Sequence, residues 1–333
     1  MKTNPCKMLA LAVLVAVITI QCSKSGGGDP PENGGDSTVN NPPKTVRQIV
    51  LADQSVNRVA IADVDSNKVV WEWLPEKSNV GVNDVKWFVN MSDAKPVYNN
   101  KYILANASTG GVALIRIADK KTVFYAYAGN GNVHSAEVLP DGNIVIAAST
   151  GNYLMLFKTD TTAYPFSGYT KKITVADAHN VVWDKKRQLL FTASKNKLYA
   201  FTYNFNCAAP DLTLKDSTTL PASGSHDLFP LYGKDSLWLT TSNKIWAINV
   251  STKAVTEQSD LPRVKSVSSG PNEKYPAILL QSIDGDKQWY NDKVIDMKGN
   301  TVYQLNGLKA YKGRWLLPCS FSYDSDSVVH LCK

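Results

Sequence analysis

The chain has 333 residues, of which 44% are hydrophobic and 10% aromatic, so it is long enough to bury a large core. The formal net charge of +7 is dispersed without runs of lysine or arginine, which argues against nucleic acid as a partner. Charged residues make up only 20% of the chain, and Val, Thr, Tyr and Trp are plentiful, which favours strands over helices.

The first residues read as an export signal. Lys2 and Lys7 accompany an apolar segment, residues 8–20, that suits a signal peptide and is too short to span a bilayer comfortably. Cys22 and a Ser- and Gly-rich stretch follow, an arrangement that resembles a bacterial lipoprotein signal of the Bacteroidetes type. We therefore expect a signal peptide at residues 1–21, lipidation of Cys22 and attachment to the cell envelope (outer membrane or cell surface) through lipid alone. The alternative is ordinary secretion, with Cys22 incidental.

Residues 22–45 are rich in Gly, Ser, Pro, Asn and Asp and contain no aromatic residue. Such a segment cannot bury enough apolar surface to fold, so we expect a flexible tether. Near the other end, Cys319 and Cys332 flank a possible hairpin, and in an oxidising compartment they could form a disulfide. The alternative is two buried thiols, and the sequence does not decide between them.

From residue 46 onward, short apolar strands separated by turns recur along the chain, without a sustained helical period. One strand type appears six times, at residues 49–52, 102–105, 144–147, 189–192, 237–240 and 277–280. A second strand follows most of these within a few residues. Four-stranded units of this length are typical of propeller blades, which bury their faces only against neighbouring blades.

A polar residue marks the start of the strand that precedes each repeat. These six landmarks are Asn83, His134, His179, His226, Lys265 and Lys309, and they lie 39 to 51 residues apart. They predict an all-β fold, a six-bladed β-propeller over residues 46–333, closed by a C-terminal strand near Lys309 that joins the N-terminal strands. Possible strands at 315–318 and 327–330 leave an incomplete seventh blade as the alternative.

The first residues of the inner strands should surround one mouth of the central channel. We therefore expect ligand-binding residues among the landmarks and their neighbours, namely Asn83, Asp84, Lys86, His134, Glu137, His179, His226, Asp227, Lys265, Lys309, Lys312 and Arg314. Three neutral imidazoles converging on one point, from His134, His179 and His226, could hold a divalent metal such as Mn or Zn. Alternatively, one histidine acts as a base or nucleophile while a lysine or arginine neutralises an anionic substrate. The simplest reading is a polar channel lining without a ligand.

Residues 133–143, 178–184, 225–230, 264–266 and 311–315 resemble an uncharacterised family of propeller proteins found in Bacteroidetes lipoproteins. The resemblance covers nearly the whole mature chain and implies the fold, but it brings no established activity. Oligogalacturonate lyases, with histidines around a manganese ion, and bacterial arylsulfotransferases, with channel His and Arg residues, are similar only in layout.

The sequence thus predicts an envelope-anchored, monomeric propeller that binds a small or oligomeric ligand, an anionic glycan fragment, at the channel mouth. One alternative is a lyase that uses a metal held by the three histidines, with Lys265 or Arg314 offsetting a substrate carboxylate. Another is a protein-interaction scaffold with an inert channel. The sequence leaves open whether the protein is an enzyme.

Overall fold

The computed structural model describes residues 46–323 apart from 161, 163–164, 167 and 285–286. The expected signal peptide, Cys22, the tether, Cys332 and the possible strand at 327–330 therefore lie outside the described residues. Among the described residues, no helix is long and apolar enough to cross a membrane.

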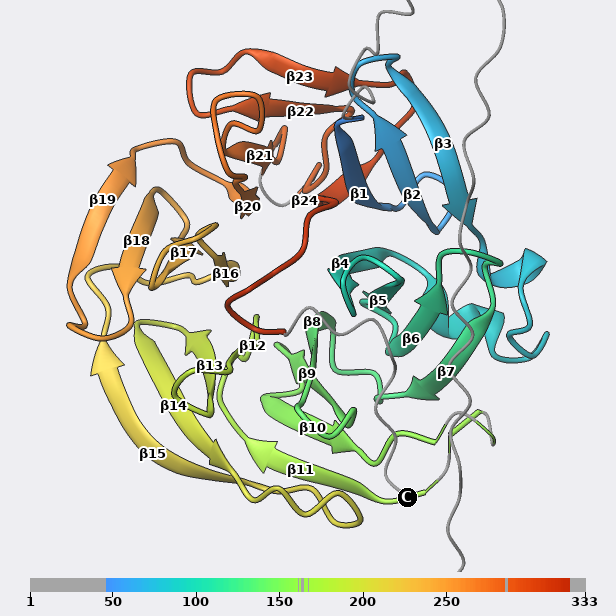
Figure 1. The fold of residues 1–333 in the computed structure, drawn as a ribbon, viewed down its shortest axis with the longest axis vertical. Coiled ribbons are helices and arrows are strands. Elements are labelled where there is room, and N and C mark those ends of the chain that lie inside the picture. Colours follow the sequence, from blue (N-terminus) through green and yellow to red (C-terminus); the bar gives the residue numbers. More distant parts are fainter. Residues whose placement is uncertain (1–45, 161, 163–164, 167, 285–286, 324–333) are drawn as a thin grey trace, which may run out of the picture. The chain divides into compact units, whose positions relative to one another are not determined.

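Six four-stranded antiparallel sheets form a ring around a central channel, so the predicted six-bladed propeller is confirmed (Figure 1). Each blade is given from its inner to its outer strand. Blade 1 consists of β24 (Ala310–Trp315), β1 (Gln48–Asp53), β2 (Arg58–Asp63) and β3 (Lys68–Trp73), and blade 2 of β4 (Met91–Val97), β5 (Tyr102–Ala107), β6 (Gly111–Arg116) and β7 (Thr122–Tyr127). Blade 3 consists of β8 (Val133–Val138), β9 (Ile144–Ala148), β10 (Tyr153–Phe157) and β11 (Thr170–Thr174).

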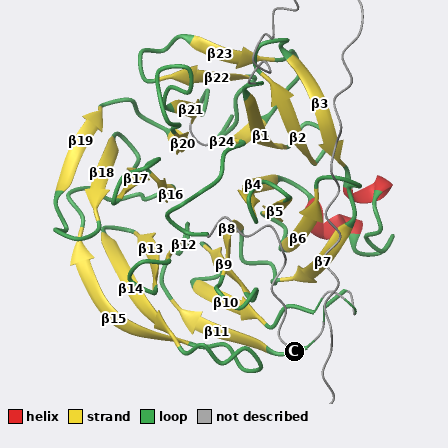
Figure 2. Ribbon diagram, viewed as in Figure 1, coloured by secondary structure: helices red, strands yellow, loops and turns green. Residues whose placement is uncertain are grey.

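The remaining three blades follow the same order. They are blade 4 with β12 (Val182–Asp184), β13 (Leu189–Ser194), β14 (Lys197–Tyr203) and β15 (Leu212–Thr219), blade 5 with β16 (Asp227–Pro230), β17 (Ser236–Thr240), β18 (Ile245–Asn249) and β19 (Val255–Ser259), and blade 6 with β20 (Val264–Ser268), β21 (Ile278–Gln281), β22 (Lys293–Asp296) and β23 (Thr301–Gln304). The helices that the structure describes are two short 3₁₀ turns, η1 (Pro75–Lys77) and η2 (Val85–Phe88), and Figure 2 shows them beside blade 2.

The two ends of the propeller meet in blade 1. The C-terminal strand β24 pairs antiparallel with the N-terminal strand β1, with Val50 opposite Arg314 and Ile49 opposite Trp315. This closure confirms the expectation that the stretch near Lys309 supplies the missing inner strand. Because β24 already uses Trp315, the sequence around residues 315–318 does not begin a seventh blade.

The apolar core consists of six clusters, and each one lies between two adjacent blades. Between blades 2 and 3, for example, the ring of Phe124 meets that of Phe157 at 6.3 Å. Burying one large apolar side chain contributes about 1.5–3 kcal/mol, so a blade gains most of its stability from its neighbours. The apolar strands of the sequence therefore need neighbouring blades on both faces, and they specify a closed ring and not isolated sheets.

The segment after β24 crosses the centre of the ring (Figure 1). Leu317 packs in the cluster between blades 6 and 1, whereas the carbonyl of Phe321 accepts a hydrogen bond from Lys185 of blade 4 at 3.2 Å. Residues 317–321 lie over the C-terminal ends of inner strands, close to Pro96 and Phe229. The segment therefore covers one end of the channel, and within the described residues it leaves uncovered the other end, the mouth, where the inner strands begin.

The structure decides the question that the sequence left open for Cys319. This residue lies in the crossing segment and is a free thiol, so it does not pair with Cys332, whereas Cys207 is disulfide-bonded. Burial raises the pKa of the Cys319 thiol.

Candidate functional site

A repeated backbone feature positions the residues of the channel mouth. In five blades, a residue with positive φ stands two positions before the mouth residue, namely Asn90, Asn132, Asp177, Gly224 and Arg263. In four blades, the pairing of the inner strand then shifts by one residue, as in a β-bulge. A β-bulge changes the direction of one side chain, which then no longer follows the alternation of side chains between the two faces of the sheet. The six mouth residues, here called the mouth layer, are Tyr311, Ser92, His134, His179, His226 and Lys265 in order around the ring.

Five of these side chains form a continuous arc. Lys265 Nζ lies 3.3 Å from His226 Nε2, and the ring of His226 meets that of His179 edge-on at 5.3 Å. The ring of His179 stacks on that of His134 at 4.7 Å with an interplanar angle of 15°. His134 Nδ1 lies 3.3 Å from the hydroxyl of Tyr311. The three histidines predicted to meet are thus brought together at one opening.

Burial sets the protonation of this arc. Loss of hydration lowers the pKa of His134 well below its ordinary value, and the nearby His179 and Lys312 lower it further. Burial and then Lys265 lower the pKa of His226 in the same way. Burial raises the pKa of Tyr311. At neutral pH these two imidazoles are uncharged and the phenol keeps its proton.

A pocket of about 400 Å³ opens above the arc. Its floor consists of His134, His179, His226, Lys265 and Tyr311, and its wall is formed by Gln54, Asn90, Ser108, Asn132 and Trp289. Trp289 is 38% exposed, and its indole N–H donates to Gln54 Oε1 at 2.9 Å. The pocket therefore combines one lysine, several amides and an aromatic face, and its size lies in the range of small-molecule sites.

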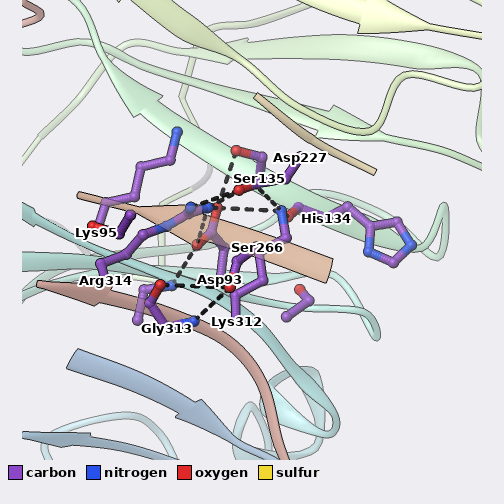
Figure 3. A network of polar contacts seen from close by, with 12 residues as sticks. Asp93, Lys95, His134, Ser135, Asp227, Ser266, Lys312, Gly313 and Arg314 are labelled. Atoms are coloured by element: carbon purple, nitrogen blue, oxygen red, sulfur yellow. Dashed lines mark hydrogen bonds and ion pairs between the residues drawn. The ribbon is translucent and has the colours of Figure 1, made fainter. Parts of the chain in front are cut away.

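Below the mouth layer the channel is filled by a buried ion cluster (Figure 3). Arg314 donates to both carboxylate oxygens of Asp227, at 2.6 and 2.7 Å, and reaches Asp93 at 3.3 Å. Lys312 lies 3.2 Å from Asp227 and 3.5 Å from Asp93, and it donates to the carbonyl of His134 at 3.0 Å. In Figure 3 the ring of His134 points away from this cluster.

A second buried pair completes the cluster. Lys95 Nζ lies 3.2 Å from Glu137 and donates to the carbonyl of Val181 at 2.7 Å. Burial raises the pKa of Glu137 to about 7, although Lys95 acts against the rise. Burial also disfavours the charged form of Asp227, but Arg314 and Lys312 hold its pKa below the ordinary value. Three cations thus face three carboxyl groups, so the opposite charges of the cluster are matched in number.

The predicted residues therefore divide by position. His134, His179, His226 and Lys265 line the mouth pocket, whereas Glu137, Asp227, Lys312 and Arg314 lie beneath it in the ion cluster. Lys309 is exposed, with its ammonium 5.2 Å from the ring centre of Tyr290, and the mouth position belongs to Tyr311, two residues further on.

Asn83, Asp84 and Lys86 are misplaced by the sequence prediction. They lie in and before η2, where Asp84 accepts a hydrogen bond at 3.0 Å from Tyr125 of the outer strand β7. The segment with η1 and η2 is inserted before the inner strand of blade 2, so the true equivalent of His134 is Ser92 in β4. Because Ser92 is small and donates to the carbonyl of Val133, it leaves room for Tyr311 to reach His134.

The metal hypothesis receives no support from the ring geometry. Imidazole binds a metal along a lone pair in the plane of its ring, and two nearly parallel stacked rings have no nearby point in both planes. Within the part of the chain that the structure describes, no group of three His, Cys, Asp or Glu side chains is arranged to hold a metal ion. A metal bound by His134, His179 and His226 would require rotation of at least one ring.

Several pocket residues were not predicted as ligand-binding, namely Tyr311, Gln54, Asn90, Ser108, Asn132 and Trp289. One signal was present in the sequence. Asn90 and Asn132 both stand two residues before a mouth residue, and asparagine tolerates positive φ better than most residues.

Comparisons with known proteins agree with the fold. A crystal structure of a protein of unknown function from Bacteroides caccae is 16% identical, covers 81% of this chain and 99% of that chain, and has a TM-score of 0.54. A functionally unknown protein from Desulfotomaculum acetoxidans DSM 771 is 12% identical, covers 79% and 96% of the two chains, and has a TM-score of 0.50.

A comparison with curated proteins returned no match. A family model does match, and it spans residues 6–331, which include every blade and the whole mouth pocket. This agrees with the resemblance to an uncharacterised propeller family, and the chain belongs to the family described as "Family of unknown function (DUF6528)".

Proposed function

We propose that this protein is an exported, lipid-anchored propeller that binds a small or oligomeric anionic glycan fragment in the mouth pocket. The observation that carries the proposal is the position of Lys265. It is the one lysine or arginine among the described residues that line the pocket, it is 8% exposed, and it lies beside imidazoles that burial keeps neutral. A carboxylate entering the pocket would meet this ammonium without displacing an existing ion pair of the cluster below.

The remaining lining supports a sugar as the bearer of that carboxylate. Gln54, Asn90 and Asn132 carry amides that both donate and accept, as ring hydroxyl groups require, and Trp289 offers an aromatic face for a sugar ring. The ion cluster and the crossing segment close the channel below, so a ligand enters and leaves by one side.

The export proposal has support of its own. Cys207 is disulfide-bonded, and disulfides persist mainly in oxidising compartments outside the cytosol. Replacement of Cys22 by serine should release the protein from the membrane fraction of a bacterial host and abolish labelling by a fatty-acid analogue. Unchanged fractionation and labelling of Cys22→Ser would contradict lipidation at this residue.

Binding is tested by thermal shift and calorimetry with galacturonate oligomers, and with neutral galactose oligomers as the ligand control. A ligand that binds only the folded state raises the melting temperature by mass action. We expect a shift with the uronates alone, and we expect Lys265→Met to weaken binding by at least about tenfold, as loss of a charge-assisted contact of about 1.5–3 kcal/mol implies.

Lys309→Met is the matched control, because it removes the same charge from an exposed lysine that does not line the pocket. It should leave uronate binding unchanged. The proposal fails if uronates and neutral sugars behave alike, or if the two lysine variants lose the same affinity.

A further inference from the structure

Each of the three histidines has a ring nitrogen in contact with another polar group, and this contact determines which of its two ring nitrogens carries the proton. The ammonium of Lys265 can only donate, so Nε2 of His226 accepts and its proton resides on Nδ1, which is buried and has no partner among the described residues. The hydroxyl of Tyr311, whose pKa is raised by burial, lies 3.3 Å from Nδ1 of His134, and we assign it as the donor, which leaves the proton of His134 on Nε2.

His179 has the opposite arrangement. Its Nδ1 lies 3.2 Å from the carboxylate of Asp177 and 3.1 Å from the carbonyl of the same residue, and both are acceptors. The proton of His179 therefore resides on Nδ1, and Nε2 keeps its lone pair. His179 is thus the histidine whose basic nitrogen is left for the pocket, and its ring lies between those of His134 and His226, at centroid distances of 4.7 and 5.3 Å.

We propose that the mouth pocket is catalytic and that His179 transfers a proton in a β-elimination on a uronate-containing glycan. This inference rests on the proposed uronate binding. Nε2 of His179 takes the proton from the carbon next to the carboxylate, and the electron pair of that C–H bond forms a carbon–carbon double bond. The bond from the adjacent carbon to the glycosidic oxygen breaks, and this oxygen takes the proton back from His179.

The neighbours of His179 fit the charge that such a step develops. Negative charge accumulates on the substrate carboxylate when the proton leaves, and the ammonium of Lys265 is the cation that the described lining of the pocket offers to it. Asp177 is a positioning residue, since it fixes the tautomer and the orientation of His179 and does not touch the substrate. The atoms and electrons of the step balance without a further reactant.

The assay follows the ultraviolet absorbance of the unsaturated uronate product during incubation with polygalacturonate, alginate and chondroitin. We expect product from at least one of them with the full mature protein. His179→Ala should lower kcat by at least about 100-fold, the usual minimum contribution of a general base, while uronate affinity stays within about tenfold. Added imidazole should restore part of this activity, which it would not do if His179 were only structural.

Asp177→Asn should lower kcat by about tenfold with KM within about twofold, since it disturbs orientation and not binding. Asp119→Ala is the control for handling and folding, because Asp119 is exposed and pairs with Arg116 at the edge of blade 2. Uronate binding without any unsaturated product, or full activity of His179→Ala, would overturn the catalytic inference and leave the binding proposal intact. Absence of uronate binding would overturn both.

Discussion

The mouth layer and the ion cluster beneath it come from the same inner strands but differ in how their polar groups are satisfied. In the ion cluster, Arg314 and Lys312 meet Asp227 and Asp93 through several short contacts. In the mouth layer, Lys265 lies beside a neutral imidazole, and no carboxylate is found among the described residues that line the pocket. Opposite charges pair and close the channel in the ion cluster, whereas the mouth layer presents a cation among neutral polar groups, which suits an anionic ligand.

The contrast between the ion cluster and the mouth layer is tested first by removing a charge from the ion cluster. Arg314→Met leaves Asp227 and Asp93 buried with fewer partners, and breaking one partner of a buried pair costs about 3–5 kcal/mol. Lys265→Met, in the mouth layer, should lower the free energy of unfolding by less than Arg314→Met does, because Lys265 contacts a neutral imidazole and Arg314 holds two buried carboxylates. Urea denaturation of both variants checks the contrast, and equal losses of stability would refute the division into a structural and a functional layer.

The pH dependence of stability offers a second test, at Glu137. Its pKa in the folded state is raised from 4.5 to about 7, so the unfolded state releases this proton first as the pH rises. The contribution of Glu137 is therefore fully present below about pH 4.5 and is lost as the pH rises through 7. The loss amounts to about 3 kcal/mol at 1.36 kcal/mol per pH unit.

Glu137→Gln cannot ionise and should not show this loss. The difference in the free energy of unfolding between wild type and Glu137→Gln should therefore shift by about 3 kcal/mol, in favour of the variant, between pH 4.5 and pH 8. Taking the difference removes the opposing contribution of His134 and His226, whose lowered pKa values cost stability as the pH falls below 6.5. A constant difference across this range would contradict the account of Glu137.

A smaller effect is expected in the mouth layer. Burial and Lys265 keep His226 neutral, and an anion beside Lys265 would raise the pKa of this imidazole again. Uronate binding should therefore take up protons and strengthen by up to about tenfold per pH unit below pH 6.5, because binding and protonation are linked. Calorimetry in buffers of different ionisation enthalpy measures the uptake. Binding that is independent of pH and buffer would show that the imidazoles do not respond to the ligand.

The smallest expected effect concerns metals. Because the rings of His134 and His179 are stacked, Zn²⁺ or Mn²⁺ should give no saturable increase in melting temperature. His134→Ala and His179→Ala should behave like the wild type in this titration. A saturable shift that both variants abolish would restore the metal-dependent alternative.

The fold was accessible from the sequence because its signal is repeated. Short apolar strands recur six times, and the polar landmarks His134, His179, His226 and Lys265 mark equivalent positions, so one misreading does not change the architecture. The convergence of the three histidines followed from that repetition. Closure by β24 was predictable for the same reason, since the N-terminal strands lacked an inner partner.

The remaining site residues were less accessible because local irregularities shift the register. The inserted η1–η2 segment moved the landmark of blade 2 from Ser92 to Asn83, and in blade 1 the landmark was placed at Lys309, two residues before Tyr311 and just before β24 begins. A sequence pattern also does not show how deep in the channel a given side chain lies. Arg314 and Lys265 are both basic residues of inner strands, yet Arg314 is bound in the ion cluster and Lys265 lines the pocket.

A crystal structure of the mature protein with a galacturonate oligomer would test the central claim most directly. The account predicts the ligand in the mouth pocket, with a carboxylate oxygen within hydrogen-bond distance of Lys265 Nζ and a sugar ring against Trp289. A ligand bound on the outer strands, or one that displaces Asp227 from Arg314, would contradict it.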